Sequence, residues 1–149
     1  MKLLVSGGLG FIGSNFIVKL LENTKDINVV NIDAEFQGSN HENLSKIKNN
    51  KNYSFVKGNI TNKNLMEKLI QDSDIIVNFA AESFVDRSIL DANPFLVSNI
   101  RGTFTILDLI KNTKKRFLQI STDEVFGSLK TDTAYENTRF NPSSPYAAT

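Results

Sequence analysis

Five short apolar runs, each long enough for one strand, alternate along this chain with segments whose apolar residues recur at helical spacing. Strands that are apolar on both faces and alternate with helices predict a parallel sheet covered on each side, and right-handed crossovers lead to a doubly wound α/β fold. The predicted strands are Lys2 to Val5, Asn28 to Ile32, Tyr53 to Val56, Asp74 to Phe79 and Arg116 to Ile120, the last read as a buried strand, and the predicted helices are Phe11 to Leu21, Lys63 to Ile70 and about Pro94 to Lys111.

Length and charge exclude several classes of protein. A chain of 149 residues that is 40% hydrophobic suffices for one domain and is too short for two. The net charge of +1 would not attract nucleic acid or an anionic membrane, and neither a bilayer-spanning run nor a signal peptide is recognisable, so we expect a cytoplasmic protein. The sequence has no cysteine, and its single histidine, His41, which we expect in a surface loop, has no second histidine to complete a metal site.

A glycine-rich turn, with Gly7, Gly10 and Gly13, joins the first predicted strand to the first predicted helix. Such a turn lets backbone N–H groups approach a pyrophosphate at a helix N-terminus, and its last glycine allows close packing of helix on strand. Asp33 follows twenty residues after Gly13 and ends the second strand, where a carboxylate binds an adenosine ribose. The alternative is a tight turn with a coincidental acid, but position and spacing together predict a Rossmann-like dinucleotide site.

The residues after the second strand indicate which dinucleotide binds. Asp33 and Glu35 bring two carboxylates near the ribose, and no Lys or Arg follows until Lys46. A 2′-phosphate would therefore meet repulsion without a counter-ion, which favours NAD over NADP.

A hydroxyl and two carboxylates, Thr122, Asp123 and Glu124, come just after the last predicted strand, following Ser121. In a parallel α/β sheet the ligand crevice lies at the carboxyl ends of the strands, so an acid and a base are expected there. An ordinary turn after a strand would also contain Asp or Ser, which is the alternative for this tripeptide alone. The segment from Gly127 to Pro145, with Asp132, predicts an irregular loop that could cover a substrate, and a helix begins near Tyr146.

Taken together, these motifs resemble the N-terminal part of the extended short-chain dehydrogenase/reductases that act on nucleotide sugars. Asn78-Phe79-Ala80-Ala81 resembles their strand end beside the nicotinamide ribose, and the runs Ala80 to Ile89, Ser121 to Gly127 and Pro142 to Tyr146 most resemble dTDP-glucose 4,6-dehydratases. Plant-type UDP-glucose 4,6-dehydratases share Thr-Asp-Glu. The other readings are an epimerase or decarboxylase of the same superfamily, or a non-catalytic NAD-binding module.

The resemblance implies a role for each candidate residue. Tyr146 would act as base on the sugar C4 hydroxyl, which Thr122 would hold, while NAD takes a hydride from C4 and returns it to C6. Glu124 would remove the C5 proton and Asp123 would protonate the departing C6 hydroxyl, so that dTDP-glucose, or UDP-glucose, becomes a 4-keto-6-deoxy sugar. The residues carried over as cofactor-binding are Gly7, Gly10, Phe11, Ile12, Gly13, Asp33, Ala34, Glu35, Phe36, Asn59, Ile60, Phe79, Ala80, Ala81, Glu82, Ser83 and Ser98, with Ser83 and Thr122 also at the substrate.

The chain departs from that family in several places. Asn59 stands where the family usually has Asp beside the adenine, so we expect altered binding there, and Phe84 replaces a common His. The lysine that partners Tyr146 would follow Thr149, and the family's C-terminal sugar-nucleotide domain would come after it. We therefore expect residues 1–149 to be an incomplete NAD-binding domain that is inactive alone, and the full-length protein to be a homodimer.

Overall fold

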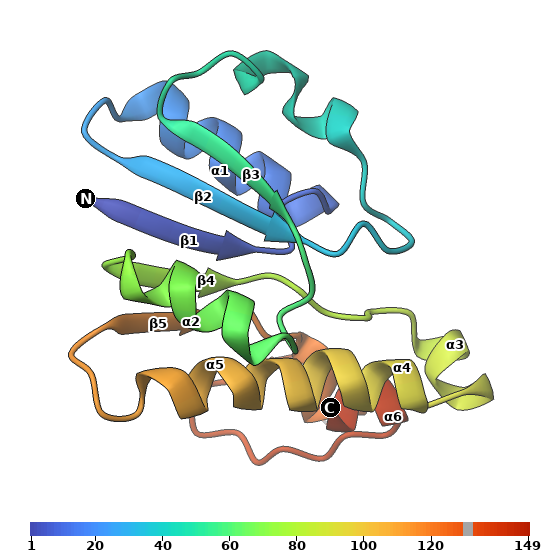
Figure 1. Cartoon of the computed structure of the whole chain (residues 1–149). Helices are drawn as coiled ribbons and strands as arrows, with labels where there is room; N and C mark the ends of the chain where they lie inside the picture. The colour runs from blue at the N-terminus through green and yellow to red at the C-terminus, as the bar shows by residue number, and fades with distance from the viewer. Residues whose placement is uncertain (130–132) are drawn as a thin grey trace.

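The computed structural model describes residues 1–129 and 133–149, and within them the chain forms a sheet of five parallel strands in the order β3-β2-β1-β4-β5 (Figure 1). This confirms the predicted fold class, and each strand ends within one residue of its expected bounds. The strands are β1 (Lys2–Ser6), β2 (Asn28–Asp33), β3 (Tyr53–Lys57), β4 (Ile75–Asn78) and β5 (Arg116–Gln119).

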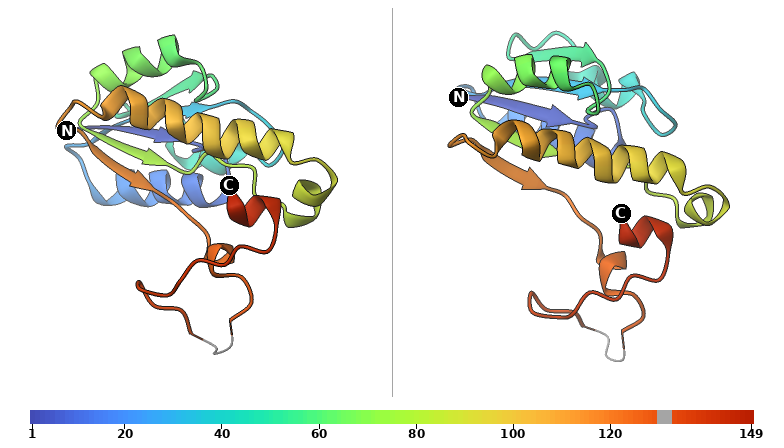
Figure 2. Two further views of the ribbon diagram at one scale, coloured as in Figure 1. Left: turned by 90° about the horizontal axis from the view of Figure 1, so that it is seen from below. Right: turned by 60° about the horizontal axis from the view of Figure 1, so that its bottom comes forward.

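Helices cover both faces of the sheet, as a doubly wound topology requires (Figure 2). On one face, α1 (Phe11–Asn23) and the 3₁₀ helix η1 (His41–Ile47) pack with Leu3 and Val5 of β1. On the other, α2 (Lys63–Gln71) and α5 (Thr103–Ile110) pack around Leu4. Successive side chains of β1 therefore enter opposite cores, which is why its sequence is continuously apolar.

The long predicted helix is present, but it contains a turn that its apolar spacing did not reveal. It begins as α4 (Asn93–Phe95), widens into the π-helix η2 (Leu96–Gly102) and continues as α5, forming one rod along the sheet (Figure 1). A π-turn inserts an extra residue into a helix and often marks a functional site. Here it accompanies the burial of Asn99.

Short helices were harder to predict than long ones, because a few residues carry no periodic signal. The prediction of a helix near Tyr146 is confirmed by α6 (Pro145–Ala148), which Ser144 caps by accepting from the Ala147 N–H. The helices α3 (Val85–Leu90), η1 and η3 (Asp123–Phe126) were missed. His41 is exposed, as expected, but it begins η1 instead of lying in a loop. Between Gly127 and Ser144 the described residues form no helix or strand, and Asp132 lies outside the described residues.

The expectation that β5 is buried was wrong. The strand pairs with β4 and lies at the edge of the described sheet, where Leu118 keeps 52% of its surface exposed. An apolar run indicates a strand, but it does not specify the position of that strand in the sheet order.

One ion-pair cluster joins the two helices on the same face of the sheet. Asp108 of α5 accepts from the Nζ atoms of Lys111 and of Lys63, which begins α2, both at 2.7 Å. Hydrogen bonds from these two ammonium groups, with the largest contribution from Lys111, lower the pKa of Asp108 from 3.8 to about 2. A carboxyl group with a lowered pKa in the folded state stabilises the fold above its unfolded pKa, and this contribution is lost as the pH falls.

We therefore expect Asp108→Asn to lower the melting temperature at pH 6, because it removes both ion pairs. The decrease should be only roughly 2 °C, because the two lysines are largely exposed to solvent. The difference from the unsubstituted chain should shrink below pH 4 and vanish only below pH 2, where the Asp108 carboxyl is protonated in both the folded and the unfolded state. Thermal denaturation followed by circular dichroism at several pH values checks this, with Glu22→Gln as a matched loss of one carboxylate. A difference as large at pH 2 as at pH 6 would contradict it.

Candidate functional site

The glycine-rich turn between β1 and α1 is shaped by close backbone contacts. Gly7 adopts a φ of 73°, and a Cβ atom there would lie 2.5 Å from the backbone N of Ala80. A Cβ on Gly13 would lie 2.5 Å from the carbonyl oxygen of Gly7. The turn is fixed from β2, because Asn31 Oδ1 accepts from the Gly8 N–H and Asp33 Oδ2 accepts from the Leu9 N–H, each at 3.0 Å.

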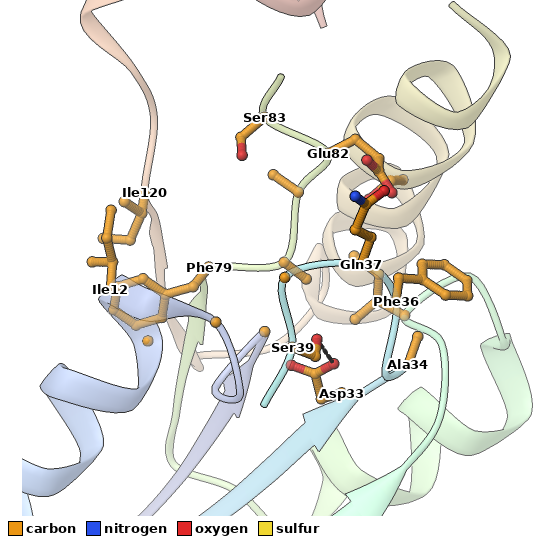
Figure 3. A pocket seen from close by; sticks show the side chains of 18 of the residues that line it. Ile12, Asp33, Ala34, Phe36, Gln37, Ser39, Phe79, Glu82, Ser83 and Ile120 are labelled. Atoms are coloured by element: carbon orange, nitrogen blue, oxygen red, sulfur yellow. Dashed lines mark hydrogen bonds between the residues drawn. The ribbon is translucent and has the colours of Figure 1, made fainter. Parts of the chain in front are cut away.

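This turn forms one wall of a cavity of about 440 Å³ at the carboxyl ends of the central strands (Figure 3). All of the predicted cofactor-binding residues line it except Glu35. The described residues that line it include no Lys, Arg or His, and no side chain caps the N-terminus of α1 by a hydrogen bond. A pyrophosphate bound here would therefore be met by backbone N–H groups and by the helix dipole.

Asp33 is held in a fixed orientation where β2 ends at the cavity. Its Oδ1 accepts from the Glu35 N–H at 2.9 Å and from the Ser39 hydroxyl at 2.8 Å, a bond drawn in Figure 3. The carboxylate is 6% exposed and lies where β2 ends. The carboxylate already accepts from the Ser39 hydroxyl, and its remaining lone pairs could accept from ribose hydroxyls as well.

Glu35 does not face the cavity. Its carboxylate forms an ion pair with Lys57 of β3 and lies 2.7 Å from the Nε2 of His41. Hydrogen bonds with these two partners, with the largest contribution from Lys57, lower the pKa of Glu35. The expectation that no cation lies near the ribose missed Lys57, because the sheet brings it beside Asp33 although it is distant in the sequence.

A second cavity of about 330 Å³ adjoins the first and shares Ala80, Ala81, Ile120, Ser121 and Tyr146 with it. Thr122 lines this second cavity. The ring of Tyr146 lies edge-on to Phe95, with the centroids 6.2 Å apart. The fold therefore brings Thr122 and Tyr146 to one cavity, next to the end of the dinucleotide cavity.

Asp123 and Glu124 lie on the neighbouring turn, η3, and are exposed. The Thr122 hydroxyl caps this turn by accepting from the Glu124 N–H at 3.2 Å. Gly127, with a φ of 62°, ends the turn and donates to the Glu124 carbonyl at 3.0 Å. Neither carboxylate is among the residues that line the two cavities, so the structure places them next to Thr122 but outside both linings.

Two buried amides organise the site and were not predicted as site residues. Asn99 Oδ1 accepts from the Glu82 N–H at 2.9 Å, and its Nδ2 donates to the Glu82 carbonyl and to Thr149 Oγ1, both at 3.0 Å. Asn78 Oδ1 accepts from the Ser6 hydroxyl at 2.5 Å. The signal for Asn99 was a polar residue inside an otherwise apolar stretch, which is costly to bury without partners, whereas Asn78 also belongs to the run that resembles the family's strand end.

The two departures from the family pattern also lie at the cavity. Asn59 uses its Oδ1 to accept from both the backbone N–H and the hydroxyl of Thr61, each at 2.9 Å. Phe84 is 52% exposed, and the guanidinium of Arg87 lies 5.7 Å from the centre of its ring. The amide oxygen expected to serve an adenine is therefore already bonded within its own turn.

Within residues 1–129 and 133–149, no helix is long and apolar enough to cross a bilayer. The same residues contain no group of three or more His, Asp or Glu side chains arranged to hold a metal ion.

The sequence matches the family model described as GDP-mannose 4,6-dehydratase over residues 4–149. It is 47% identical to the low-salt glycan biosynthesis protein Agl12 of Haloferax volcanii, over 100% of this chain and 48% of that protein. It is 40% identical to the dTDP-glucose 4,6-dehydratase of Mycolicibacterium smegmatis, over 100% of this chain and 45% of the relative. The chain thus spans about half the length of these curated relatives.

Solved structures show the same similarity. The dTDP-glucose 4,6-dehydratase DesIV of Streptomyces venezuelae, a double mutant with NAD and DAU bound, superposes with a TM-score of 0.94 at 37% identity over 99% of this chain and 48% of that one. The UDP-glucuronic acid 4-epimerase of Bacillus cereus, in complex with UDP-glucuronic acid and NAD, gives 0.90 at 33% identity over 99% and 48%.

Proposed function

The chain belongs to the family described as GDP-mannose 4,6-dehydratase, and we propose that it is the NAD-binding part of a lyase that dehydrates dTDP-glucose to the 4-keto-6-deoxy sugar. The observation that carries this proposal is the position of Thr122, Asp123 and Glu124, which follow β5 after two residues, with Thr122 lining the second cavity and the two acids on the turn that it caps. A cytoplasmic location stays a prediction from the sequence.

The residues at the first cavity fit NAD. Gly7 and Gly13 permit the close backbone packing that shapes the turn at the start of α1, because a Cβ at either position would lie 2.5 Å from a backbone atom, and Asp33 offers a fixed carboxylate for the adenosine ribose. Bound NAD would supply a hydride acceptor at the sugar C4 and a hydride donor at C6. The remaining cofactor contacts carried over from the family, including Ser83 and Ser98, line the same cavity.

Thr122 and Tyr146 of the second cavity, together with Asp123 and Glu124 on the neighbouring turn, would divide the proton transfers. Tyr146 would take the proton of the C4 hydroxyl, which Thr122 would orient by a hydrogen bond. Glu124 would remove the C5 proton, which a 4-keto group makes acidic, and Asp123 would protonate the leaving C6 hydroxyl. A neighbouring acid and base allow the C5 proton to be removed and the C6 hydroxyl to be protonated in one elimination.

The epimerases among the similar structures keep an alternative open, since they share this fold and are crystallised with NAD. The tripeptide Thr122-Asp123-Glu124 favours dehydration, because elimination at C5 and C6 needs an acid and a base. Epimerisation at C4 has no elimination step and does not need this pair. A UDP-sugar in place of dTDP-glucose is the other alternative, and it concerns a part of the substrate that the described cavities do not distinguish.

The decisive test uses the full-length protein that contains this chain. We expect incubation with dTDP-glucose and NAD to give a product lighter by one water, detected by mass spectrometry, with UDP-glucose as the parallel substrate. Residues 1–149 alone should bind NADH without converting the sugar, because the relatives are about twice as long. Inversion at C4 without loss of water would favour the epimerase reading.

An exposed apolar stripe on the long helix supports the proposed homodimer. Its large side chains are 44–64% exposed and recur at helical spacing: Leu96, Val97, Ile100, Phe104 and Leu107. Contiguous apolar surface of this kind is typical of a protein interface.

We expect Phe104→Glu in the full-length protein to weaken the dimer at least about tenfold, because it places a charge at the centre of the stripe. Analytical ultracentrifugation over a range of concentrations measures this. Leu90→Glu is the matched control, because Leu90 is 86% exposed and lies on α3, outside the stripe. An unchanged dimer in Phe104→Glu would contradict the assignment.

A further inference from the structure

Two charged side chains and one imidazole gather just outside the adenosine end of the cavity. The carboxylate of Glu35 is paired with the ammonium of Lys57 and with the Nε2 of His41, 2.7 Å away. The Glu35 side chain is 26% exposed, whereas those of His41 and Lys57 are 59% and 69% exposed. Glu35 is therefore the shared and most buried member of this cluster.

Lys57 lies opposite Asp33 in the register between β2 and β3. Side chains at paired positions of parallel strands point to the same face of the sheet, and the strands are about 4.8 Å apart. The flexible four-carbon stem of Lys57 thus starts beside the residue proposed to bind the ribose hydroxyls. His41 stands on the same side, with its ring edge-on to Phe55 of β3 at 4.9 Å.

The backbone of Glu35 is turned to make this pairing. Glu35 has a φ of 58°, and among the described residues it is the one non-glycine residue with a positive φ. That conformation is unfavourable for a residue with a Cβ atom, so local interactions must hold it. Its N–H donates to Asp33 Oδ1 at 2.9 Å while its carboxylate contacts Lys57 and His41. One residue therefore links the ribose-binding carboxylate to the basic groups beside it.

We propose that Glu35 is a specificity-determining residue that excludes NADP by holding Lys57 and His41 as ion-pair partners. A 2′-phosphate beside Asp33 would need a cation, and the described residues that line the cavity supply none. The basic groups near that position are Lys57 and His41, and Glu35 occupies them both. This inference rests on the proposed NAD-binding function and adds the reason why the 2′-phosphate is refused.

The test compares NADH and NADPH binding to the chain by fluorescence titration at low salt. In Glu35→Gln the ammonium of Lys57 is released, and the preference for NADH over NADPH should fall about tenfold. Adding Lys57→Met to that variant should restore the preference. Lys57→Gln alone should raise it, which gives a second measurement of opposite sign. Glu22→Gln removes the same charge from α1 at a distance and should leave the ratio as it was.

The outcomes separate the two proposals. An unchanged ratio in folded Glu35→Gln, or a lowered ratio that survives Lys57→Met, would overturn the role of Glu35 while leaving NAD binding intact. A folded, unsubstituted chain that binds neither dinucleotide would overturn the proposed function and this inference with it. Circular dichroism of each variant establishes that it is folded.

Discussion

Glu124→Gln in the full-length protein should lower kcat for dehydration of dTDP-glucose by roughly 10²- to 10⁴-fold, because the amide cannot remove the C5 proton. The substitution should leave the turn in place, since the Glu124 N–H still donates to the Thr122 hydroxyl at 3.2 Å. NADH binding should persist, because Glu124 lines neither cavity. Steady-state kinetics together with an NADH titration measure both effects.

Two comparisons make this result specific. Glu136→Gln removes an exposed carboxylate from the loop after residue 132 and should retain the full rate. Asp123→Asn should also lose elimination, because the C6 hydroxyl would leave without a proton. A non-catalytic NAD-binding module would be indifferent to both Asp123 and Glu124, so unchanged kinetics in the two variants would contradict the dehydratase assignment.

The five strands were predicted well, because the apolar run that indicates a strand lies within a few consecutive residues. Continuous apolar runs such as Leu3 to Val5 can be strands buried on both faces, and the structure places these residues in two cores. The exposure of β5 could not be predicted in this way, because it depends on which strands lie beside it. The π-turn around Asn99 was equally hidden, since a single extra residue in a helix hardly changes the spacing of its apolar positions.

The site residues divide in the same way: those at fixed offsets in the sequence were predictable, and those whose positions depend on distant partners were not. The glycine turn and Asp33 were predictable because they lie at fixed offsets along the chain, and the structure brings them to one cavity. The orientation of Glu35 was not predictable, because its partners come from β3 and η1. Asn78 and Asn99 gave only a weak signal, since a buried amide is recognised by the bonds it makes and not by its spacing.

Gly7→Ala should abolish detectable NADH binding and lower the free energy of unfolding by about 2–4 kcal/mol. Part of the loss is backbone strain, because Gly7 has a φ of 73°. The rest is steric, since the new Cβ would lie 2.5 Å from the Ala80 nitrogen. That nitrogen cannot easily move, because the Phe79 N–H donates to the Ser6 carbonyl at 2.9 Å and Asn78 anchors the strand end.

Gly38→Ala separates the two contributions, because Gly38 has a φ of 97° and no atom lies within 4 Å of the position a Cβ would take. It should lose about 1 kcal/mol from strain alone. Urea denaturation of both variants gives the difference, and the excess in Gly7→Ala measures the close approach of β1 to the end of β4. Equal losses in the two variants would mean that the turn can relax away from Ala80. The steric contact with Ala80 would then not explain why position 7 is a glycine.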